Sequence, residues 1–343
     1  MAIIPLGGGG SENLNAELTT QESLIDAIEA ALVGKATGAN ATADKILKPY
    51  KAYVGKNLIT GTYVPQLVKV DGTVVTEDLN LVSILMDLKM GDLPYAFTDG
   101  SAVVLNNEIH ILGSYVDGTY TKHYKFNGTS WVQVSTLPFS FYRGSAVVLN
   151  NEIHILNDTN HYKFNGTSWT KVSTLPYSFY QGSAVVLNGE IHILGGNSNG
   201  TKHYKFNGTS WGQVSTLPYN FYLGSAVVLN NEIHILSSAD ISHRTSHYKF
   251  NGTSWTSVST LPYSFDSGSA VVLNNEIHTL AYFYHYKFNG TSWTSVSALP
   301  YSFSNGAGVV LNGEIHILGN NNYSTPVNNL RHYVVNAKVY QNS

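Results

Sequence analysis

Histidine is the first residue type to consider, because it can hold a metal ion or move a proton near neutral pH, and the chain has 13 in 343 residues. Twelve of them recur at two fixed places in six similar segments, and His243 alone lies in a segment that changes from copy to copy. A histidine repeated by duplication is most simply a packing or hydrogen-bonding residue of a strand, so we expect no metal site and no cofactor. The two series are His110, His154, His192, His234, His278 and His316, and His123, His161, His203, His247, His285 and His332.

Carboxylates offer a second kind of chemistry, the cleavage of a glycosidic bond, which needs two acids converging on one bond. Six of the glutamates, Glu108 and its equivalents, repeat like the histidines and sit where each predicted hairpin ends, which favours a structural role. We expect a protein that is not an enzyme, with a polysaccharide-degrading enzyme as an alternative. Cysteine is absent, which excludes thiolate nucleophiles, thiolate zinc sites and disulfides. The acids left in the changing segments are Asp99, Asp117, Asp158, Asp240 and Asp266.

These residues belong to a repeated framework that fills most of the chain. The block Gly-Ser-Ala-Val-Val-Leu-Asn-Asn-Glu-Ile-His-Ile-Leu, first met at 100–112, returns five more times at intervals of 38 to 44 residues. A second block, His-Tyr-Lys-Phe-Asn-Gly-Thr-Ser-Trp, first met at 123–131, follows after a variable gap, and a Leu-Pro-Tyr/Phe block leads into the next copy. Repeats of this length predict a β-propeller or a solenoid, in which each copy buries its apolar faces against its neighbours.

Each copy is expected to form four strands. The apolar run at 101–105 is typical of an inner strand pressed between neighbouring sheets. Asn-Asn or Asn-Gly then forms a tight hairpin turn into a second strand. The alternation at 123–126 indicates a third strand, and Trp131 begins the outer one. Six such copies predict a six-bladed propeller over residues 93–343.

Two details of this framework allow alternatives. The ring could close within the sixth copy, through strands at 331–335 and 337–341, or through a strand lent by 87–91; we favour the sixth copy. Asn-Gly-Thr, first met at Asn127, matches a glycosylation sequon, but Asn-Gly is also the preferred hairpin turn and that interpretation is favoured.

The blocks resemble the kelch repeat, in which an apolar run, Asn-Gly, an aromatic-apolar run and a diglycine are followed by a Tyr and a Trp. The resemblance covers residues 93–340, although only Gly195-Gly196 keeps the diglycine and histidine occupies the usual tyrosine position of the second strand. It implies an all-β, six-bladed kelch-like propeller. The Trp-Asp dipeptide of WD40 repeats is absent, which disfavours that family.

Comparison of the copies with one another shows where the chain varies. The pair before each repeat glycine changes in every copy, and so does the gap between the second and third strands. In a blade whose strands run up and down in turn, both kinds of segment emerge on one face, while the constant hairpins emerge on the other. The variable segments are rich in Tyr, Ser, Asn, Gly and Asp, a mixture typical of binding loops.

We therefore expect a recognition surface on one face of the propeller; the alternative is that surface segments drift freely while strands do not. Tyrosine is its commonest aromatic residue, and a saccharide is the favoured ligand because aromatic rings flanked by Asn, Gln and Arg suit sugars. The expected binding residues are Asp99, Tyr115, Tyr120, Tyr142, Arg143, Tyr180, Gln181, Tyr222, Leu223, Asp266, Ser267, Tyr282, Tyr284, Ser304, Asn305 and Tyr323.

Residues 1–92 lack the repeat and are expected to form a small α+β attachment region. The stretch 1–36 combines an apolar tip, the glycines 7–10 and one amphipathic helix that begins at the capping box Thr19-Thr-Gln-Glu22. Such a helix needs a partner for its apolar stripe, either its own copies in a homotrimer or the rest of this region. Residues 37–92 are expected to form an adaptor domain with two short hairpins.

The segment Ala41-Thr-Ala-Asp-Lys-Ile-Leu-Lys-Pro-Tyr-Lys-Ala-Tyr-Val-Gly-Lys-Asn-Leu-Ile-Thr-Gly-Thr62 resembles one common in tail and baseplate-associated proteins of phages of Gram-positive bacteria. The resemblance implies a receptor-binding protein of the tail tip or baseplate. Its partners would be a host-surface receptor and, through residues 1–92, other tail proteins. The alternative within the virion is a purely structural tail component.

Charge and hydropathy limit the other partners. A net charge of -3 with 12% charged residues gives no electrostatic footprint for nucleic acid or an anionic membrane. The first residues lack the basic flank and long apolar core of a signal peptide, and no run is long enough to span a bilayer. We expect synthesis in the host cytoplasm, a final location in the virion, and no membrane insertion.

Overall fold

The computed structural model describes residues 81–116, 118–320 and 330–342, together with four short strands that precede them. The chain divides into two units, one made of Met1–Lys89 with Asn336–Ser343 and the other of Met90–Val335. In the first unit β1 (Lys51–Val54) pairs with β2 (Asn57–Thr60), and β3 (Leu67–Val68) pairs with β4 (Val74–Val75). The expected amphipathic helix lies outside the described residues.

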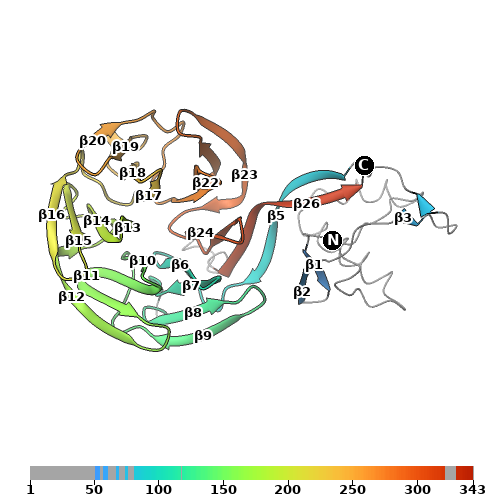
Figure 1. The fold of residues 1–343 in the computed structure, drawn as a ribbon, viewed down its shortest axis with the longest axis horizontal. Helices are drawn as coiled ribbons and strands as arrows, with labels where there is room; N and C mark the ends of the chain where they lie inside the picture. The colour runs from blue at the N-terminus through green and yellow to red at the C-terminus, as the bar shows by residue number, and fades with distance from the viewer. Residues whose placement is uncertain are drawn as a thin grey trace. The chain divides into compact units, whose positions relative to one another are not determined.

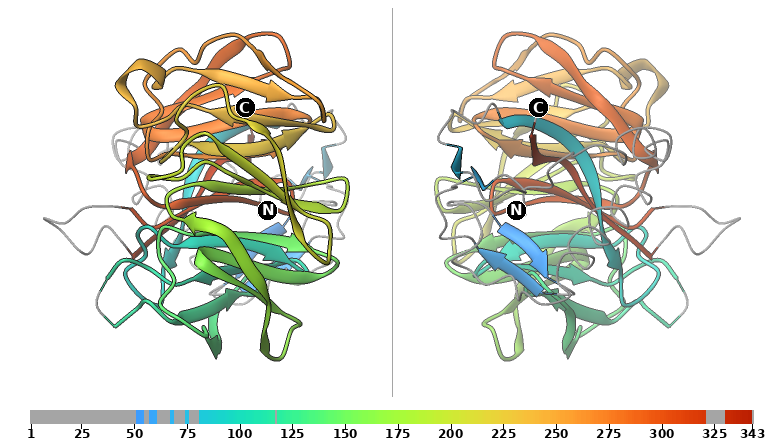
Figure 2. Two further views of the ribbon diagram at one scale, coloured as in Figure 1. Left: turned by 90° about the vertical axis from the view of Figure 1, so that its left-hand side faces the viewer. Right: turned by 90° about the vertical axis from the view of Figure 1, so that its right-hand side faces the viewer.

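The second unit is a ring of six antiparallel sheets, in which each copy of the repeat forms a blade (Figure 1). Blade 1 comprises β6 (Ser101–Leu105), β7 (Glu108–Leu112), β8 (Lys122–Phe126) and β9 (Trp131–Thr136). Blade 3 repeats it with β13 (Ser183–Leu187), β14 (Glu190–Leu194), β15 (Lys202–Phe206) and β16 (Trp211–Thr216), and blade 4 with β17 (Ser225–Leu229), β18 (Glu232–Leu236), β19 (His247–Phe250) and β20 (Trp255–Ser257). The prediction of an all-β six-bladed propeller is confirmed. In side view the blades follow one another in chain order (Figure 2).

Blades 2 and 5 have the shortest gaps, four residues each, and there the second and third strands run together. Blade 2 comprises β10 (Ser145–Leu149), β11 (Glu152–Phe164) and β12 (Trp169–Phe179). Blade 5 comprises β21 (Ser269–Leu273), β22 (Glu276–Phe288) and β23 (Trp293–Phe303). Non-glycine residues with positive φ, Asp158 and Tyr282, make the reversals inside β11 and β22.

Ring closure differs from the expectation. The sixth copy was expected to supply its own third and fourth strands, but β26 (Arg331–Asn342) is one continuous strand. The sheet order of blade 6 is β24 (Ala307–Leu311), β25 (Glu314–Leu318), β26 and then β5 (Leu81–Asp92). The segment before the first copy therefore provides the outer strand, and the backbone N–H of Leu93 donates to the carbonyl of Leu330 at 2.6 Å. The strand lent by the preceding segment, the alternative considered above, is the one observed.

The hydrophobic core consists of clusters that successive blades share. In one of them, Val103 and Leu112 of blade 1 pack against Phe141, Ile153 and Ile155, which lead into or belong to blade 2. Phe141, Ile153 and Ile155 are fully buried. Because each cluster draws on two blades, no blade buries its apolar faces alone, as the repeat pattern predicts.

Neighbouring blades are also tied by hydrogen bonds at the first residue of the inner strand. The hydroxyl of Ser101 accepts from the backbone N–H of Ala146 at 3.0 Å, and Ser145 does the same for Ala184. Ser183, Ser225 and Ser269 continue the series. The sixth copy has Ala307 at this position, so the junction with blade 1 has no serine hydroxyl to offer.

Candidate functional site

The two kinds of variable segment meet on one face of the ring. We call the segment just before each repeat glycine, such as Thr98 and Asp99, the link into that blade. The gap of blade 1 is hydrogen-bonded to the link into blade 1, since Tyr115 N–H donates to Thr98 O at 2.8 Å. Blade 3 repeats this contact through Asn197 and Tyr180, at 2.8 Å. The links and gaps thus form one continuous surface, here called the varied face.

Six link residues form a closed ring of backbone hydrogen bonds at the centre of the varied face. Each donates its N–H to the carbonyl of the equivalent residue in the preceding link, at 2.6 to 2.8 Å, and the bond from Asp99 to Asn305 closes the circle. All six have a positive φ, between 52° and 60°. We call Asp99, Arg143, Gln181, Leu223, Ser267 and Asn305 the axial ring.

The residue types in the axial ring are unusual for their backbone conformation. A left-handed backbone costs an L-residue with a side chain about 1–2 kcal/mol, and Gly, Asn and Asp occupy it most readily. The constant hairpins of the opposite face follow that rule, with Asn106, Asn107, Gly128 and their equivalents. The axial ring instead holds Arg143, Gln181 and Leu223 in the same conformation. Backbone preference therefore does not explain these side chains.

The axial ring surrounds the mouth of a central channel. A cavity of about 110 Å³ is lined by the six ring residues and the glycines that follow them. Behind it lies a channel of about 340 Å³ lined by inner-strand valines, among them Val103, Val148, Val271 and Val309. The mouth is polar except at Leu223, whereas the channel is apolar.

Four of the expected tyrosines gather beside the ring, where blade 1 joins blade 2. The ring centroid of Tyr142 lies 5.0 Å from that of Tyr115, 5.5 Å from Tyr120 and 5.9 Å from Tyr180. The Arg143 guanidinium lies 4.7 Å from the centre of the Tyr115 ring and 5.9 Å from that of Tyr180. Tyr115 is 39% exposed. We call Tyr115, Tyr120, Tyr142 and Tyr180 with Arg143 the tyrosine cluster.

An ion pair holds the arginine of this cluster in place. Arg143 Nε donates to Asp99 Oδ2 at 3.3 Å, and the Asp99 side chain is only 5% exposed. Burial raises the pKa of the Asp99 carboxyl, and the charge of Arg143 and its hydrogen bond act in the opposite direction. Since Asp99 is the counter-ion of Arg143, the cluster presents arginine as a paired cation stacked against phenol rings, with little net charge to offer an anion.

A second aromatic group lies at blade 5. Tyr263 stacks on Tyr286 at 5.2 Å between centroids and lies 4.9 Å from Tyr284. Phe283 and Tyr284 are 55% and 49% exposed. The Tyr282 hydroxyl donates to Asp266 Oδ1 at 3.1 Å, and burial followed by the charge of Asp266 raises the pKa of that phenol. We call Tyr263, Tyr282, Phe283, Tyr284 and Tyr286 the blade 5 cluster.

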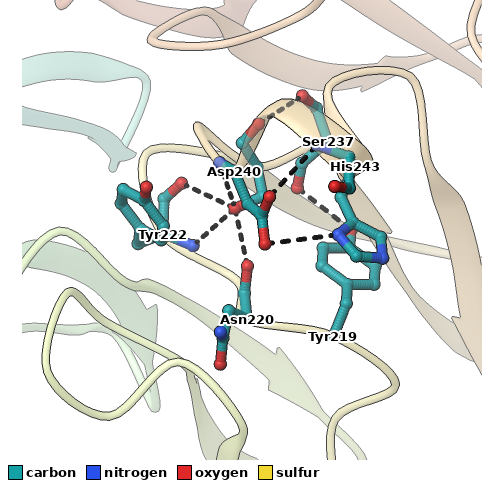
Figure 3. A network of polar contacts seen from close by, with 8 residues as sticks. Tyr219, Asn220, Tyr222, Ser237, Asp240 and His243 are labelled. Atoms are coloured by element: carbon teal, nitrogen blue, oxygen red, sulfur yellow. Dashed lines mark hydrogen bonds and ion pairs between the residues drawn. The ribbon is translucent and has the colours of Figure 1, made fainter.

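The gap of blade 4 is held by a polar network around the short helix η2 (Ile241–His243) (Figure 3). Ser238 Oγ donates to Asn220 O at 2.6 Å and accepts from Asp240 N at 3.2 Å. His243 stacks on Tyr219, with centroids 4.6 Å apart, and its Nδ1 lies 3.5 Å from Asp240 Oδ2. The serine is bonded to backbone groups and the histidine lies beside Asp240, so this Ser, Asp and His together shape a loop and do not form a nucleophile with its base.

The remaining expected residues are spread more widely. The backbone N–H groups of Tyr222 and Ser304 donate to side chains in the gap of their own blade, Ser238 Oγ and Asn320 Oδ1 respectively. Asp266, Tyr282 and Tyr284 belong to the blade 5 group, while Gln181, Leu223, Ser267 and Asn305 lie in the axial ring. Tyr323 and Asp117 lie outside the described residues.

Sequence reasoning missed Tyr263 and Tyr286, because both occupy repeated positions and were assigned to the framework. In blades with a longer gap, the equivalent tyrosine donates its hydroxyl to the first gap carbonyl, as Tyr177 does to Gly195 at 2.9 Å. The four-residue gap of blade 5 instead places Tyr284 against Tyr263. The shortness of that gap was the available signal.

The twelve repeated histidines form six buried pairs. In blade 1, His110 Nδ1 lies 2.9 Å from His123 Nε2, and His123 Nδ1 lies 3.1 Å from Ser135 Oγ. That hydroxyl also accepts from Trp169 Nε1 of blade 2 at 3.0 Å. Burial lowers the pKa of His110 to about 4 and that of His123 to about 3. The pairs thus join strand to strand and, through serine and tryptophan, blade to blade.

Nothing in the described part of the chain gathers three or more His, Cys, Asp or Glu side chains in a way that could hold a metal ion. Among the same residues, no helix is long and apolar enough to cross a membrane.

Comparison with known proteins bears on the fold. No protein-family model and no curated protein matches the chain. Among solved structures it is similar to YjhT, a kelch-repeat protein, with a TM-score of 0.61 over 73% of this chain and 99% of that one. The likeness establishes a six-bladed β-propeller. At 14% sequence identity it extends to the fold alone.

Proposed function

We propose that this chain is a binding protein whose varied face recognises a saccharide on a surface. The observation that carries the proposal is the axial ring, where Arg143, Gln181 and Leu223 hold a backbone conformation that Gly or Asn would adopt at lower cost. Strain that a simpler residue would relieve marks positions kept for their side chains, and such positions concentrate at functional sites.

The chemistry of the varied face favours a sugar over an apolar or an anionic ligand. Exposed phenol and phenyl rings at Tyr115, Phe283 and Tyr284 offer flat surfaces on which a sugar ring can stack. Gln181, Ser267 and Asn305 offer hydrogen-bond donors and acceptors that suit hydroxyl groups. The pairing of Arg143 with Asp99 leaves the tyrosine cluster close to neutral.

We further propose that the propeller is the receptor-binding part of a phage tail tip or baseplate protein. This part of the proposal is supported by the resemblance of residues 41–62 to tail-associated proteins. Residues 1–92 would attach the chain to other tail proteins, and the propeller would meet the host surface. Weak contacts made by several copies would combine through effective concentration.

The described aspartates support binding over cleavage of the polysaccharide. Asp99 pairs with Arg143, Asp158 Oδ1 accepts from Ser178 at 2.7 Å, and Asp266 accepts from Tyr282. Each carboxylate is thus held by a different neighbour, whereas a glycosidase directs two of them at one bond. A structural tail component is the other alternative; in it the varied face would contact a virion protein instead of a host.

The experiment uses the labelled full chain and cells of Gram-positive bacteria. The variant Gln181→Gly with Leu223→Gly removes two axial side chains while suiting the left-handed backbone, so the thermal midpoint should stay level or rise. Binding to cells should fall at least about tenfold, the effect of roughly 1.4 kcal/mol. The matched control is Asn106→Gly, the same kind of change on the opposite face, which should bind like the wild type. A double variant that binds as tightly as the control refutes the recognition face.

A further inference from the structure

The two aromatic clusters of the varied face belong to different blades of the ring. The inner strands follow one another around a closed ring of six, and the axial hydrogen bonds close in the same order. The tyrosine cluster is centred on the link from blade 1 to blade 2, where Tyr142 and Arg143 lie. The blade 5 cluster adjoins the link from blade 4 to blade 5, where Asp266 lies. The two clusters are therefore separate groups, one at the junction of blades 1 and 2 and the other in blade 5.

The clusters also share a composition. Each combines exposed aromatic rings with one carboxylate held by a neighbour: Asp99 by Arg143 in the first and Asp266 by the Tyr282 hydroxyl in the second. Close ring contacts of 4.9 to 5.0 Å fix the orientation of Tyr115 and Tyr284 before any ligand arrives, which lowers the entropy lost on binding. Both clusters are therefore preorganised platforms for a flat ligand with polar edges.

The axial ring lies at the centre of the varied face, and its side chains are polar except at Leu223. A ligand that reaches from one cluster to the other can pass over this ring, where Gln181, Ser267 and Asn305 can bond hydroxyl groups. The backbone groups of the ring are already engaged with one another, so only side chains are free to serve this role. A globular partner would need a complementary surface, whereas an extended chain needs only repeated contacts of one kind.

We propose that the varied face binds one linear, neutral saccharide chain that extends from the tyrosine cluster past the axial ring to the blade 5 cluster. The inference rests on the proposed function and specifies its ligand: an internal stretch of a polymer, and not a single terminal sugar. Linking two weak sites through one ligand raises affinity by about 10²- to 10⁴-fold once the ligand is long enough to reach both.

The test measures the affinity of the full chain for size-graded oligosaccharides from cellulose, amylose and chitin, by calorimetry. For at least one series, affinity should rise with chain length and then level off. Tyr115→Ala and Tyr284→Ala should each lower the affinity for the long oligosaccharides about a hundredfold, to the level of the short ones. The control Val132→Ala changes an exposed residue of β9 and should leave every affinity unchanged. Thermal midpoints verify that each variant is folded.

The other outcomes separate this inference from the proposed function. If short oligosaccharides bind as tightly as long ones, or if only one of the two variants has an effect, the spanning chain is refuted and saccharide recognition stands. If no series binds while the full chain still binds cells through Gln181 and Leu223, the ligand is of another class, such as a protein, and the inference is refuted. Loss of both kinds of binding refutes the proposed function as well.

Discussion

Mild acid should unfold the propeller, because its core holds histidines that stay neutral in mild acid only while they are buried. Burial lowers the pKa of the second-strand histidine to about 4 in five blades, against 6.5 for an unperturbed side chain. These groups bind fewer protons in the folded chain than in the unfolded one. Their contribution to stability is therefore complete above pH 6.5 and is lost as the pH falls toward 4.

The magnitude follows from the shift. A pH of 5 lies 1.5 below the pKa of these five histidines in the unfolded chain, whereas in the folded chain they are still neutral. Each one then lowers the free energy of unfolding by about 2 kcal/mol. The five groups act in the same direction, so together they lower the free energy of unfolding by several kcal/mol, a large part of the roughly 5–15 kcal/mol of a typical domain. The third-strand partners, with pKa lowered to about 3 in blades 1 to 5, can only add to this. Glu108 and Lys125 face His110 with opposing effects on its pKa.

Tryptophan fluorescence is a suitable assay because the indoles contact these histidines. Trp169 lies 5.6 Å from His123, and Trp211 lies 5.6 Å from His161. We expect the thermal midpoint to fall steeply between pH 6.5 and pH 4.5, with uptake of several protons in the acid transition. His192→Gln, which removes one titrating group, should make the transition take up fewer protons. A midpoint that is the same at pH 7 and pH 5 would contradict the reasoning.

Two further predictions concern the junctions between blades. In Gly144→Ala the new Cβ would lie 2.6 Å from Leu156 O and 2.7 Å from the Phe141 ring, so denaturant unfolding should show a loss of about 3 kcal/mol. Gly212→Ala, where nothing lies within 4 Å, is the control and should be neutral or stabilising by up to about 1 kcal/mol; equal losses would show that close packing is not the cause. Ala307→Ser supplies the hydroxyl that the other five junctions have, as an acceptor for Ala102 N–H. It should add about 1 kcal/mol to the free energy of unfolding and raise the thermal midpoint by about 2 °C. Ser145→Ala, which removes such a hydroxyl, should lower the midpoint. A lower midpoint for Ala307→Ser would mean that the sixth junction does not admit the bond.

The blades could be predicted from the sequence because their signal is repeated six times. The apolar run, the Asn-Gly turns and the tryptophan-led outer strand recur in register, so errors in one copy are corrected by the others. Closure by β5 could not be predicted equally well, because residues 81–92 share no repeated block with the outer strands of the other blades, whose place they take. Pairing of that strand depends on backbone groups and a long-range contact, neither of which leaves a repeated pattern.

The shared face of the variable segments was predictable from the sequence, whereas the grouping of their residues was not. Tyr115, Tyr142 and Tyr180 were expected on this face, and the structure gathers them at one junction because the ten-residue gap of blade 1 folds toward the following link. The axial ring could not be predicted from the sequence, for a different reason. Local preference places Arg143, Gln181 and Leu223 in extended or helical backbone, and only the closed circle of hydrogen bonds holds them left-handed.

The donated outer strand has a practical consequence for how this molecule can be divided. A fragment started at Leu93, where the first copy begins, would keep every repeat and still lack one edge of its last sheet. The exposed rim of β26 would then offer unpaired backbone groups to any neighbouring chain, including a second fragment. Fragments made for crystals or glycan arrays should therefore begin ahead of Leu81.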